Sequence, residues 1–245
     1  MEEYDYDAAA GTIIIKDITT GRINSEILRQ LKENDPGFDE LWVGNGGDER
    51  CDNEYYPKFK SANDMGWIGY FIGENTTLKE ITLCSDPFLG LPFYRGMNSN
   101  RSIQKISFHD INTGLRREIF EYLRPFFANN SNLSELEVER CQFGPGCAQQ
   151  IALALRGCSK SLKCIKFGGN QMVVGKQSVK IIEALGMHPQ LEKLEFKGMN
   201  IGSAAFANLL RGTFSELEEL NLYATIPLMT KGWMLWWVLF QAIAF

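Results

Sequence analysis

The stretch PQLEKLEFKGMNIG, from Pro189 to Gly202, decides the fold. Leu191 and Leu194 have the spacing of one side of a helix, whereas Leu194 and Phe196 alternate as in a half-buried strand. No single period accounts for both spacings. The stretch therefore predicts a short strand whose Leu194 and Phe196 face a core, followed by a turn in which Ile201 begins the return to a second element.

The same Leu-x-x-Leu-x-Leu pattern recurs along the chain, which indicates a repeat architecture. From Leu78 onward the copies follow one another at intervals of 25 to 30 residues, and a longer interval before Leu78 marks an insert. A weak first copy begins at Ala10, and the clear copies begin at Phe38, Leu78, Ile103, Leu133, Leu162, Leu191 and Leu217. The clear copies predict parallel strands at residues 39–43, 79–83, 104–108, 134–138, 163–167, 192–196 and 218–222.

Segments with helical periodicity follow these strands. GPGCAQQIALALRGC, residues 144–158, places Ala148, Ile151 and Leu155 on one face. DPFLGLPFYRG, residues 86–96, is expected to be irregular because Pro and Gly interrupt it. Further helices are predicted in NSEILRQLKEN, NTGLRREIFEYLRPFF, GKQSVKIIEALGMH and GSAAFANLLRG. One strand–turn–helix unit cannot bury both of its faces alone, whereas a stack of such units can.

These units resemble the long, helical leucine-rich repeats of the ribonuclease-inhibitor type. That family carries Cys or Asn at a fixed place after the first Leu, and Cys141 and Asn170 match it, while Met199 departs from it. The resemblance is closer still to the ribonuclease-inhibitor-like repeat proteins abundant in diatoms and related algae, through the stretches DMGWIGYFIGENTTLKEI, FYRGMNSNRSIQKISF, MHPQLEKLEFKGMNIG and TKGWM. It implies an α/β solenoid shaped as a horseshoe, with parallel strands on the concave face and helices on the convex face. It implies no defined biochemical activity.

The chain is predicted to hold one domain of about eight repeats. Residues 1–9 are predicted to form a disordered acidic tail, and residues 10–245 form the leucine-rich-repeat domain, with a loop insert at 46–60. The aromatic residues of the insert either fasten it to the repeats or contact a partner.

The chain ends in the apolar segment GWMLWWVLFQAIAF, residues 232–245. The segment is too short to span a bilayer, which favours a last-repeat helix over residues 230–245. Membrane association through this helix is an alternative. The helix has too many bulky residues for one buried stripe. We therefore expect that residues 232–245 self-associate, meet a partner or belong to a longer natural chain.

Composition excludes some classes of function. A net charge of −5 and a pI of about 5.3 do not favour a nucleic-acid partner, which selects basic surfaces. The N-terminus lacks the apolar core of a signal peptide, so a cytoplasmic or nuclear location is expected, with reduced cysteines. Without a route to the secretory pathway, the glycosylation patterns at Asn75, Asn100, Asn129 and Asn132 are interpreted as coincidental.

No motif for catalysis, a cofactor or a metal is recognised in the sequence. The histidines are His109 and His188, and Cys141 and Cys147 are spaced by the repeat rather than by ligand geometry. His109 and Ser107 would face the same side of a strand, but without an evident oxyanion hole or pocket. The pattern of a phosphate-binding loop is absent from the sequence. The expectation is a protein that is not an enzyme and has no metal or cofactor.

The strand residues between the core positions are predicted to line the concave face. Glu135, Glu137 and Glu139 would form an acidic step flanked by lysines, read either as cross-strand pairing or as a docking surface. The predicted partner-binding residues are Trp42, Lys105, His109, Glu135, Glu137, Glu139, Lys166, Lys193, Glu195, Lys197 and Tyr223. The function indicated is a non-catalytic scaffold that binds another protein through this face. A GTPase regulator similar to the Ran GTPase-activating protein, which shares this repeat type, is the alternative.

Overall fold

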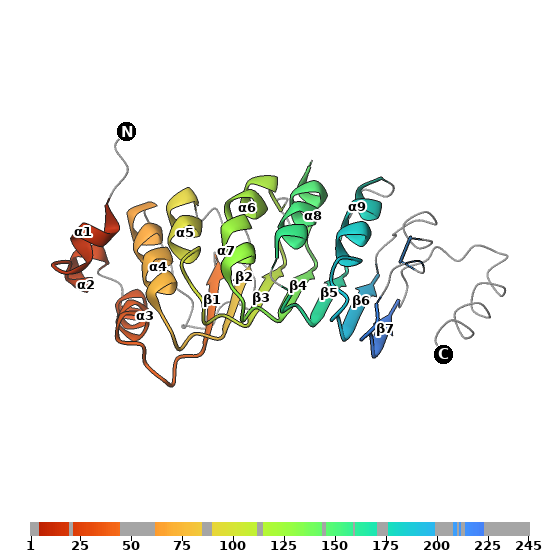
Figure 1. The fold of residues 1–245 in the computed structure, drawn as a ribbon. Coiled ribbons are helices and arrows are strands. Elements are labelled where there is room, and N and C mark those ends of the chain that lie inside the picture. The colour runs from red at the N-terminus through yellow and green to blue at the C-terminus, as the bar shows by residue number, and fades with distance from the viewer. Residues whose placement is uncertain are drawn as a thin grey trace.

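The computed structural model describes residues 5–19, 22–44, 62–84, 90–111, 115–143, 146–158, 160–170, 176–198, 208–209, 211 and 214–222. Within them, seven strands form one parallel sheet in sequence order. The strands are β1 (Glu40–Gly44), β2 (Glu80–Cys84), β3 (Lys105–His109), β4 (Glu135–Glu139), β5 (Cys164–Gly168), β6 (Lys193–Lys197) and β7 (Glu219–Asn221). Figure 1 shows the strands in one layer and the helices in a second layer along one side of them, with α1 and β7 at opposite ends of the row.

This arrangement confirms the predicted fold class, a leucine-rich-repeat solenoid. Strands β1 to β6 each begin and end one residue later than predicted, and β7 lies inside its predicted range. The register aligns Leu136 with Ile165 and Ile165 with Leu194, so equivalent repeat positions stack into a ladder. All three side chains are fully buried, as the alternation of the repeat requires.

Helices follow the strands at most of the predicted places. Ala148, Ile151 and Leu155 of α8 are all buried, which confirms the predicted apolar face. The segment predicted from residues 112–127 forms two short helices, because Pro125 occupies the first turn of the second one. The helices that pack on the sheet or extend its layer are α3 (Arg22–Glu33), α4 (Ala62–Glu74), α5 (Gly90–Met97), α6 (Arg117–Tyr122), α7 (Arg124–Asn129), α8 (Cys147–Gly157) and α9 (Lys176–Leu185).

The expectation of an irregular segment at residues 86–96 is wrong for its second half, because helix α5 begins at Gly90. Pro92 lies in the first helical turn, where a missing N–H removes no hydrogen bond. Gly96 faces α4 so closely that a Cβ there would lie 2.3 Å from the carbonyl carbon of Gly69. Proline and glycine therefore start this helix and bring it against its neighbour instead of interrupting it.

The N-terminal region also differs from the prediction. Two short helices, α1 (Tyr6–Ala10) and α2 (Ile15–Ile18), occupy part of the predicted tail and the weak first repeat, which forms no strand over its described residues. The Asp5 side chain caps α1 by accepting a hydrogen bond from the Ala8 N–H at 2.9 Å. The Tyr6 ring packs edge-on against Trp67 with ring centroids 5.0 Å apart, which orders this segment against α4.

Several predictions lie outside the described residues. They are the insert at residues 46–60, the apolar helix at 230–245 with its self-association, and residues 1–4 of the tail. Across the described ranges, none of the helices has both the length and the apolar character needed to cross a bilayer.

An asparagine at the turn before each of three strands fastens one repeat to the previous one. Nδ2 of Asn100 donates to the carbonyl oxygens of Ile72 at 2.7 Å and Asn75 at 2.9 Å, while its Oδ1 accepts the N–H groups of Ser102 and Ile103. Asn75 and Asn130 repeat this pattern before β2 and β4.

The three asparagines are at most 2% exposed, so the turn they build is part of the core. This burial gives a physical reason to interpret the glycosylation patterns at Asn75 and Asn100 as coincidental. Each side chain is engaged in the repeat junction and is inaccessible in the folded chain.

The repeat position that carries Cys or Asn in the ribonuclease-inhibitor type also forms a contact between neighbouring repeats. Nδ2 of Asn170 donates to the carbonyl of Val138 at 2.6 Å, and Sγ of Cys141 lies 3.4 Å from the carbonyl of Phe108. Cys141 and Asn170 occupy the same position in their own repeats, and each side chain contacts the strand of the preceding repeat. A small donor is required there because the site is buried.

Candidate protein-binding surface

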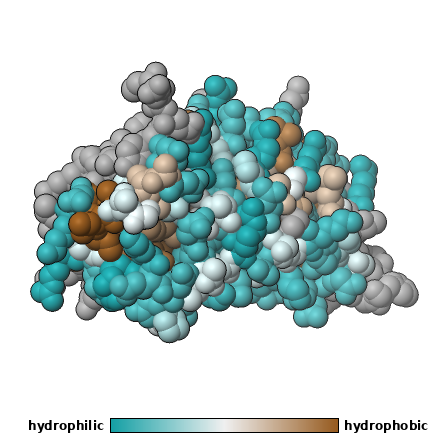
Figure 2. Space-filling model, turned by 60° about the vertical axis from the view of Figure 1, so that its left-hand side comes forward, coloured by the Kyte–Doolittle hydropathy of each residue, from teal (hydrophilic) through white to brown (hydrophobic). Residues whose placement is uncertain are grey.

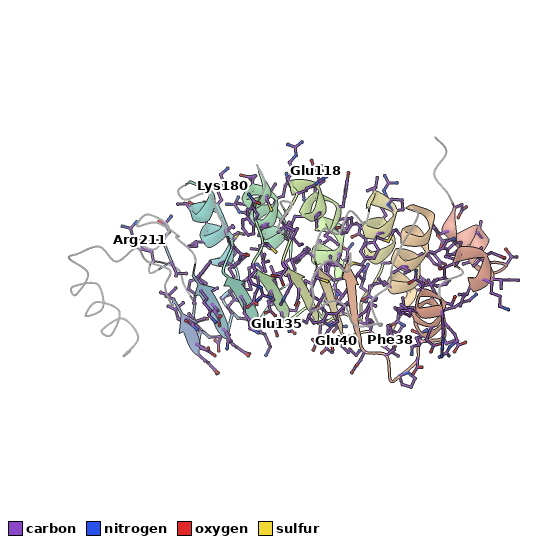
Figure 3. All side chains as sticks on the ribbon, turned by 180° about the vertical axis from the view of Figure 1, so that it is seen from behind. Phe38, Glu40, Glu118, Glu135, Lys180 and Arg211 are labelled. Carbon is purple, nitrogen blue, oxygen red and sulfur yellow. The ribbon has the colours of Figure 1, made fainter. Side chains whose placement is uncertain are left out.

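The strand face is defined here as the surface formed by the strand side chains that point away from the helices. Figure 3 labels Glu40 and Glu135 on the sheet side and Glu118 and Lys180 on the helix side. The alternation that predicted this face is seen in the burial of the strands, where Leu136 and Val138 are fully buried between glutamates. Ten of the predicted residues lie on this face, on β1 and β3 to β6, and Tyr223 lies outside the described residues.

The middle of the strand face holds a network of ion pairs, here called the central network. Lys105 Nζ lies 3.3 Å from Glu137 Oε2 and 3.8 Å from carboxylate oxygens of Glu80 and Glu135. Lys166 Nζ lies 2.5 Å from Glu135 Oε1. The predicted acidic step is therefore largely neutralised within the sheet, as the cross-strand pairing interpretation expects.

Glu137 is the most enclosed carboxylate of this network, with 9% of the residue exposed. The contact with His109, together with the charges of Lys105 and Lys166, outweighs the cost of burial and lowers the pKa of Glu137 to about 2. Burial disfavours the charge of Lys105, yet Glu135 and Glu137 outweigh it and raise the pKa of that lysine. Both groups are thus charged at neutral pH, and neither is a proton donor or acceptor of catalytic type there.

Trp42 reaches across the sheet from β1 to β3. Its ring contacts His109 edge-on with ring centroids 6.0 Å apart, and its Nε1 donates to Glu40 Oε1 at 2.5 Å. On the strands it crosses, Thr82 and Ser107 are only 5% and 1% exposed, although both point to the strand face. The predicted anchor is therefore half-buried within the sheet surface at the β1 side.

The strand face is more open beyond β5. Lys193 Nζ pairs with Glu219 Oε2 at 2.7 Å. Glu195 and Lys197, by contrast, have no ion-pair partner among the residues that the structure describes, and Lys197 is exposed. We call Glu195 and Lys197 the open pair, because neither has an ion-pair partner within the described part of the chain.

Two charged residues that the sequence analysis did not single out complete the middle of this surface. Arg140 donates to both carboxylate oxygens of Asp110, at 2.7 and 2.9 Å, and its Nη1 lies 3.4 Å from Glu139 Oε2. Asp110 and Arg140 each follow a strand directly and have positive φ angles of 54° and 49°, at the place where Gly169 and Gly198 have them too. Because both residues come at the same distance after a predicted strand, this shared position could have singled them out from the sequence.

The cysteines near the strand face are poor nucleophiles. Burial raises the pKa of Cys141 to about 12 and that of Cys164 to about 11. Both thiols are therefore protonated at neutral pH, while a nucleophilic cysteine requires the thiolate. Among the described residues, Cys84, Cys141, Cys147, Cys158 and Cys164 are free cysteines.

Little apolar surface accompanies these charges. Figure 2, in which the N-terminal end of Figure 1 comes forward, shows a surface that is hydrophilic over most of its area, with a limited hydrophobic patch. Among the large apolar side chains of the described residues, Ile14 is 61% and Met187 55% exposed. Neither of these two residues lies on a strand, and the predicted strand-face residues on β3 to β6 are all charged or histidine.

Comparison with known proteins gives a fold likeness only. No protein-family model matches the sequence, and no curated protein matches it. Among solved structures, the chain is similar to a tropomodulin C-terminal domain from Caenorhabditis elegans, with 13% identity, coverage of 79% of this chain and 92% of that chain, and a TM-score of 0.45. It is also similar to leiomodin-1 actin-binding site 2, with 14% identity, coverage of 90% and 97%, and a TM-score of 0.47.

Proposed function

We propose that this chain is a non-catalytic scaffold that binds another protein through its strand face. The observation that supports the proposal is the open pair, Glu195 and Lys197, whose charges stand on an open sheet without partners among the described residues. Charged groups placed in this way steer association and select a partner of complementary charge. The central network, in contrast, is already paired within the sheet.

Charge reversal tests the proposal. Lys197→Glu should weaken capture of a partner that binds the wild-type chain, and Lys180→Glu should leave capture unchanged. Lys180 is the matched control because it carries the same charge on the helix side (Figure 3). Equal loss in both variants, or loss in neither, would place the interaction elsewhere on the molecule.

Salt dependence gives a second readout on the same partner. Association through exposed charges should slow as ionic strength rises, because the Debye length falls from about 10 Å at 0.1 M to about 3 Å at 1 M. The slope of the association rate against salt should be smaller for Lys197→Glu than for the wild type. For the GTPase-regulator alternative, the corresponding test is GTP hydrolysis by a small GTPase, which our proposal expects the chain to leave unstimulated.

A further inference from the structure

Three side chains of metal-ligating type meet at the carboxyl ends of β3 and β4. His109, Glu137 and Glu139 each offer one ligand atom, and these atoms all lie within 4.8 Å of one another. The parallel register pairs His109 with Glu139, and Glu137 precedes Glu139 by one strand period on the same face. The sheet itself therefore holds all three donors together, so little ordering of the chain is needed to bring them onto one ion.

The spacing of the first two donors suits a shared ion better than a hydrogen bond. His109 Nε2 lies 3.5 Å from Glu137 Oε1, which is long for a hydrogen bond between these atoms. Around a tetrahedral zinc ion, with bonds of about 2.0–2.2 Å, two ligand atoms lie about 3.3–3.6 Å apart. The Trp42 ring against His109 helps to fix the imidazole in this position.

A second, independent feature points to a missing ligand at the same place. Ser107 Oγ is buried without a hydrogen-bond partner among the residues that the structure describes, and the residue is 1% exposed. Ser107 lies on the strand face between Lys105 and His109, and the register places it opposite Glu137. A buried hydroxyl without a partner is rare and calls for an explanation, such as a bound ion or water beside it.

The neighbouring cations leave one oxygen of each carboxylate for a metal. Lys105 approaches Oε2 of Glu137, and Arg140 approaches Oε2 of Glu139. Groups that hold the second oxygen of a ligating carboxylate orient it toward the ion. The positive charge of Lys105 also opposes a cation nearby, so this lysine both aligns the site and weakens it.

We propose that His109, Glu137 and Glu139 bind a divalent transition metal of the Zn²⁺ type, with a metal-bound water that hydrogen-bonds to Ser107 Oγ. An imidazole ligand favours such ions over Mg²⁺ and Ca²⁺, which take oxygen ligands. Three protein ligands leave a fourth position open for water or for an incoming group. This site departs from the sequence expectation of no metal, and it does not depend on the proposed protein-binding function.

Calorimetric titration of the intact chain with ZnCl₂ tests the site. The wild type should bind one ion, and Glu139→Gln should weaken binding by at least about 100-fold, more than loss of an outer partner of a ligand typically costs. Glu195→Gln is the matched control, because Glu195 lies on the same face without an ion-pair partner among the described residues, and it should bind like the wild type. Lys105→Met should bind more tightly than the wild type, because a repelling charge is removed.

Cobalt gives a readout that distinguishes this site from the cysteines. The Co²⁺-loaded chain should show ligand-field bands of nitrogen and oxygen ligation without a thiolate charge-transfer band, and His109→Gln should abolish them. Circular dichroism of each variant verifies that the fold is retained. Absence of zinc binding, equal affinity in Glu139→Gln and the wild type, or a thiolate band would each overturn the proposal.

Discussion

The turns that precede the strands are built differently in the two halves of the solenoid. Before β2, β3 and β4 a buried asparagine holds the preceding repeat through both its amide and its carbonyl group. Before β5, Ser161 Oγ donates to the carbonyl of Leu133 at 2.6 Å, and before β6, His188 Nε2 lies 2.8 Å from the carbonyl of Leu155. The described contacts at these junctions thus come from a buried asparagine before β2, β3 and β4, and from a serine and a histidine before β5 and β6.

The strand face changes one repeat further along, between β5 and β6. The central network pairs charged side chains over β2 to β5, whereas β6 carries the open pair. One repeat fold therefore distributes its polar groups in two ways. Those of the central network bond to one another, and those of the open pair have no ion-pair partner among the described residues.

The largest effect expected from this comparison is that of Asn100→Ala. The change leaves two buried carbonyls and two buried N–H groups without their partner, so we expect a loss of about 3–5 kcal/mol in the free energy of unfolding. Ser161→Ala, which removes the hydrogen bond from Ser161 Oγ to the carbonyl of Leu133 before β5, should cost about 1 kcal/mol. Urea unfolding monitored by circular dichroism measures both values. Equal losses would mean that the asparagine junctions are not the stronger ones.

The next effect is a pH dependence near neutrality that comes from His188, at the junction before β6. Burial lowers the pKa of His188, whose residue is 2% exposed, so the folded state disfavours the charged imidazole. Because the unfolded chain takes up the proton first, the stability due to neutral His188 is complete above about pH 6.5 and falls as the pH decreases below it, by at most about 1.4 kcal/mol per pH unit.

The variant His188→Asn separates this histidine from other titrating groups. The variant places an asparagine at the position that asparagine occupies before β2, β3 and β4. An amide side chain does not titrate between pH 5 and pH 7. Unfolding midpoints between pH 7 and pH 5 should therefore fall less steeply for the variant than for the wild type. An identical slope in both chains would assign the pH dependence to other groups.

The strands were predictable from the sequence to within one residue at most of their ends. A strand that buries one face alternates apolar and polar residues, as Leu194 and Phe196 do, and this alternation is visible in the sequence. The helix α5 was missed for a physical reason. Proline and glycine count as helix breakers when their position and neighbours are not known. In the structure Pro92 lies in the first turn of α5, and Gly96 packs closely against Gly69 of α4. Neither placement can be read from the sequence alone. The N-terminal helices depend on Tyr6 packing against a residue far along the chain.

The strand face was predictable as a set of residues but not as a network. Strand alternation places Glu135, Glu137 and Glu139 on one side, and the register then decides which cation each meets. Arg140 was overlooked because it follows the strand in a turn with positive φ. Burial of Ser107 and Thr82 on an outward face could not be inferred, since strand alternation gives the side to which a residue points but not its exposure.

The smallest expected effect distinguishes the two regions of the strand face. Lys166 and its partner Glu135 have side chains that are 25% and 24% exposed, so their contact is partly shielded from solvent. Lys166→Met should lower the free energy of unfolding by about 1 kcal/mol, near the upper end for exposed pairs. Lys197→Met, which removes no ion pair among the described residues, should change it by less than about 0.5 kcal/mol.

Repeating this pair of measurements at high salt sharpens the difference between the regions. Salt screens exposed charges strongly and partly buried pairs much less, so the loss in Lys166→Met should persist in part at 1 M salt. The effect of Lys197→Met should stay near zero at every salt concentration, because this lysine forms no ion pair among the described residues that salt could weaken. If the two variants unfold alike at low salt, the central network does not stabilise the fold. The whole strand face would then be equally free to meet a partner, and the division between a paired region and an open region would be wrong.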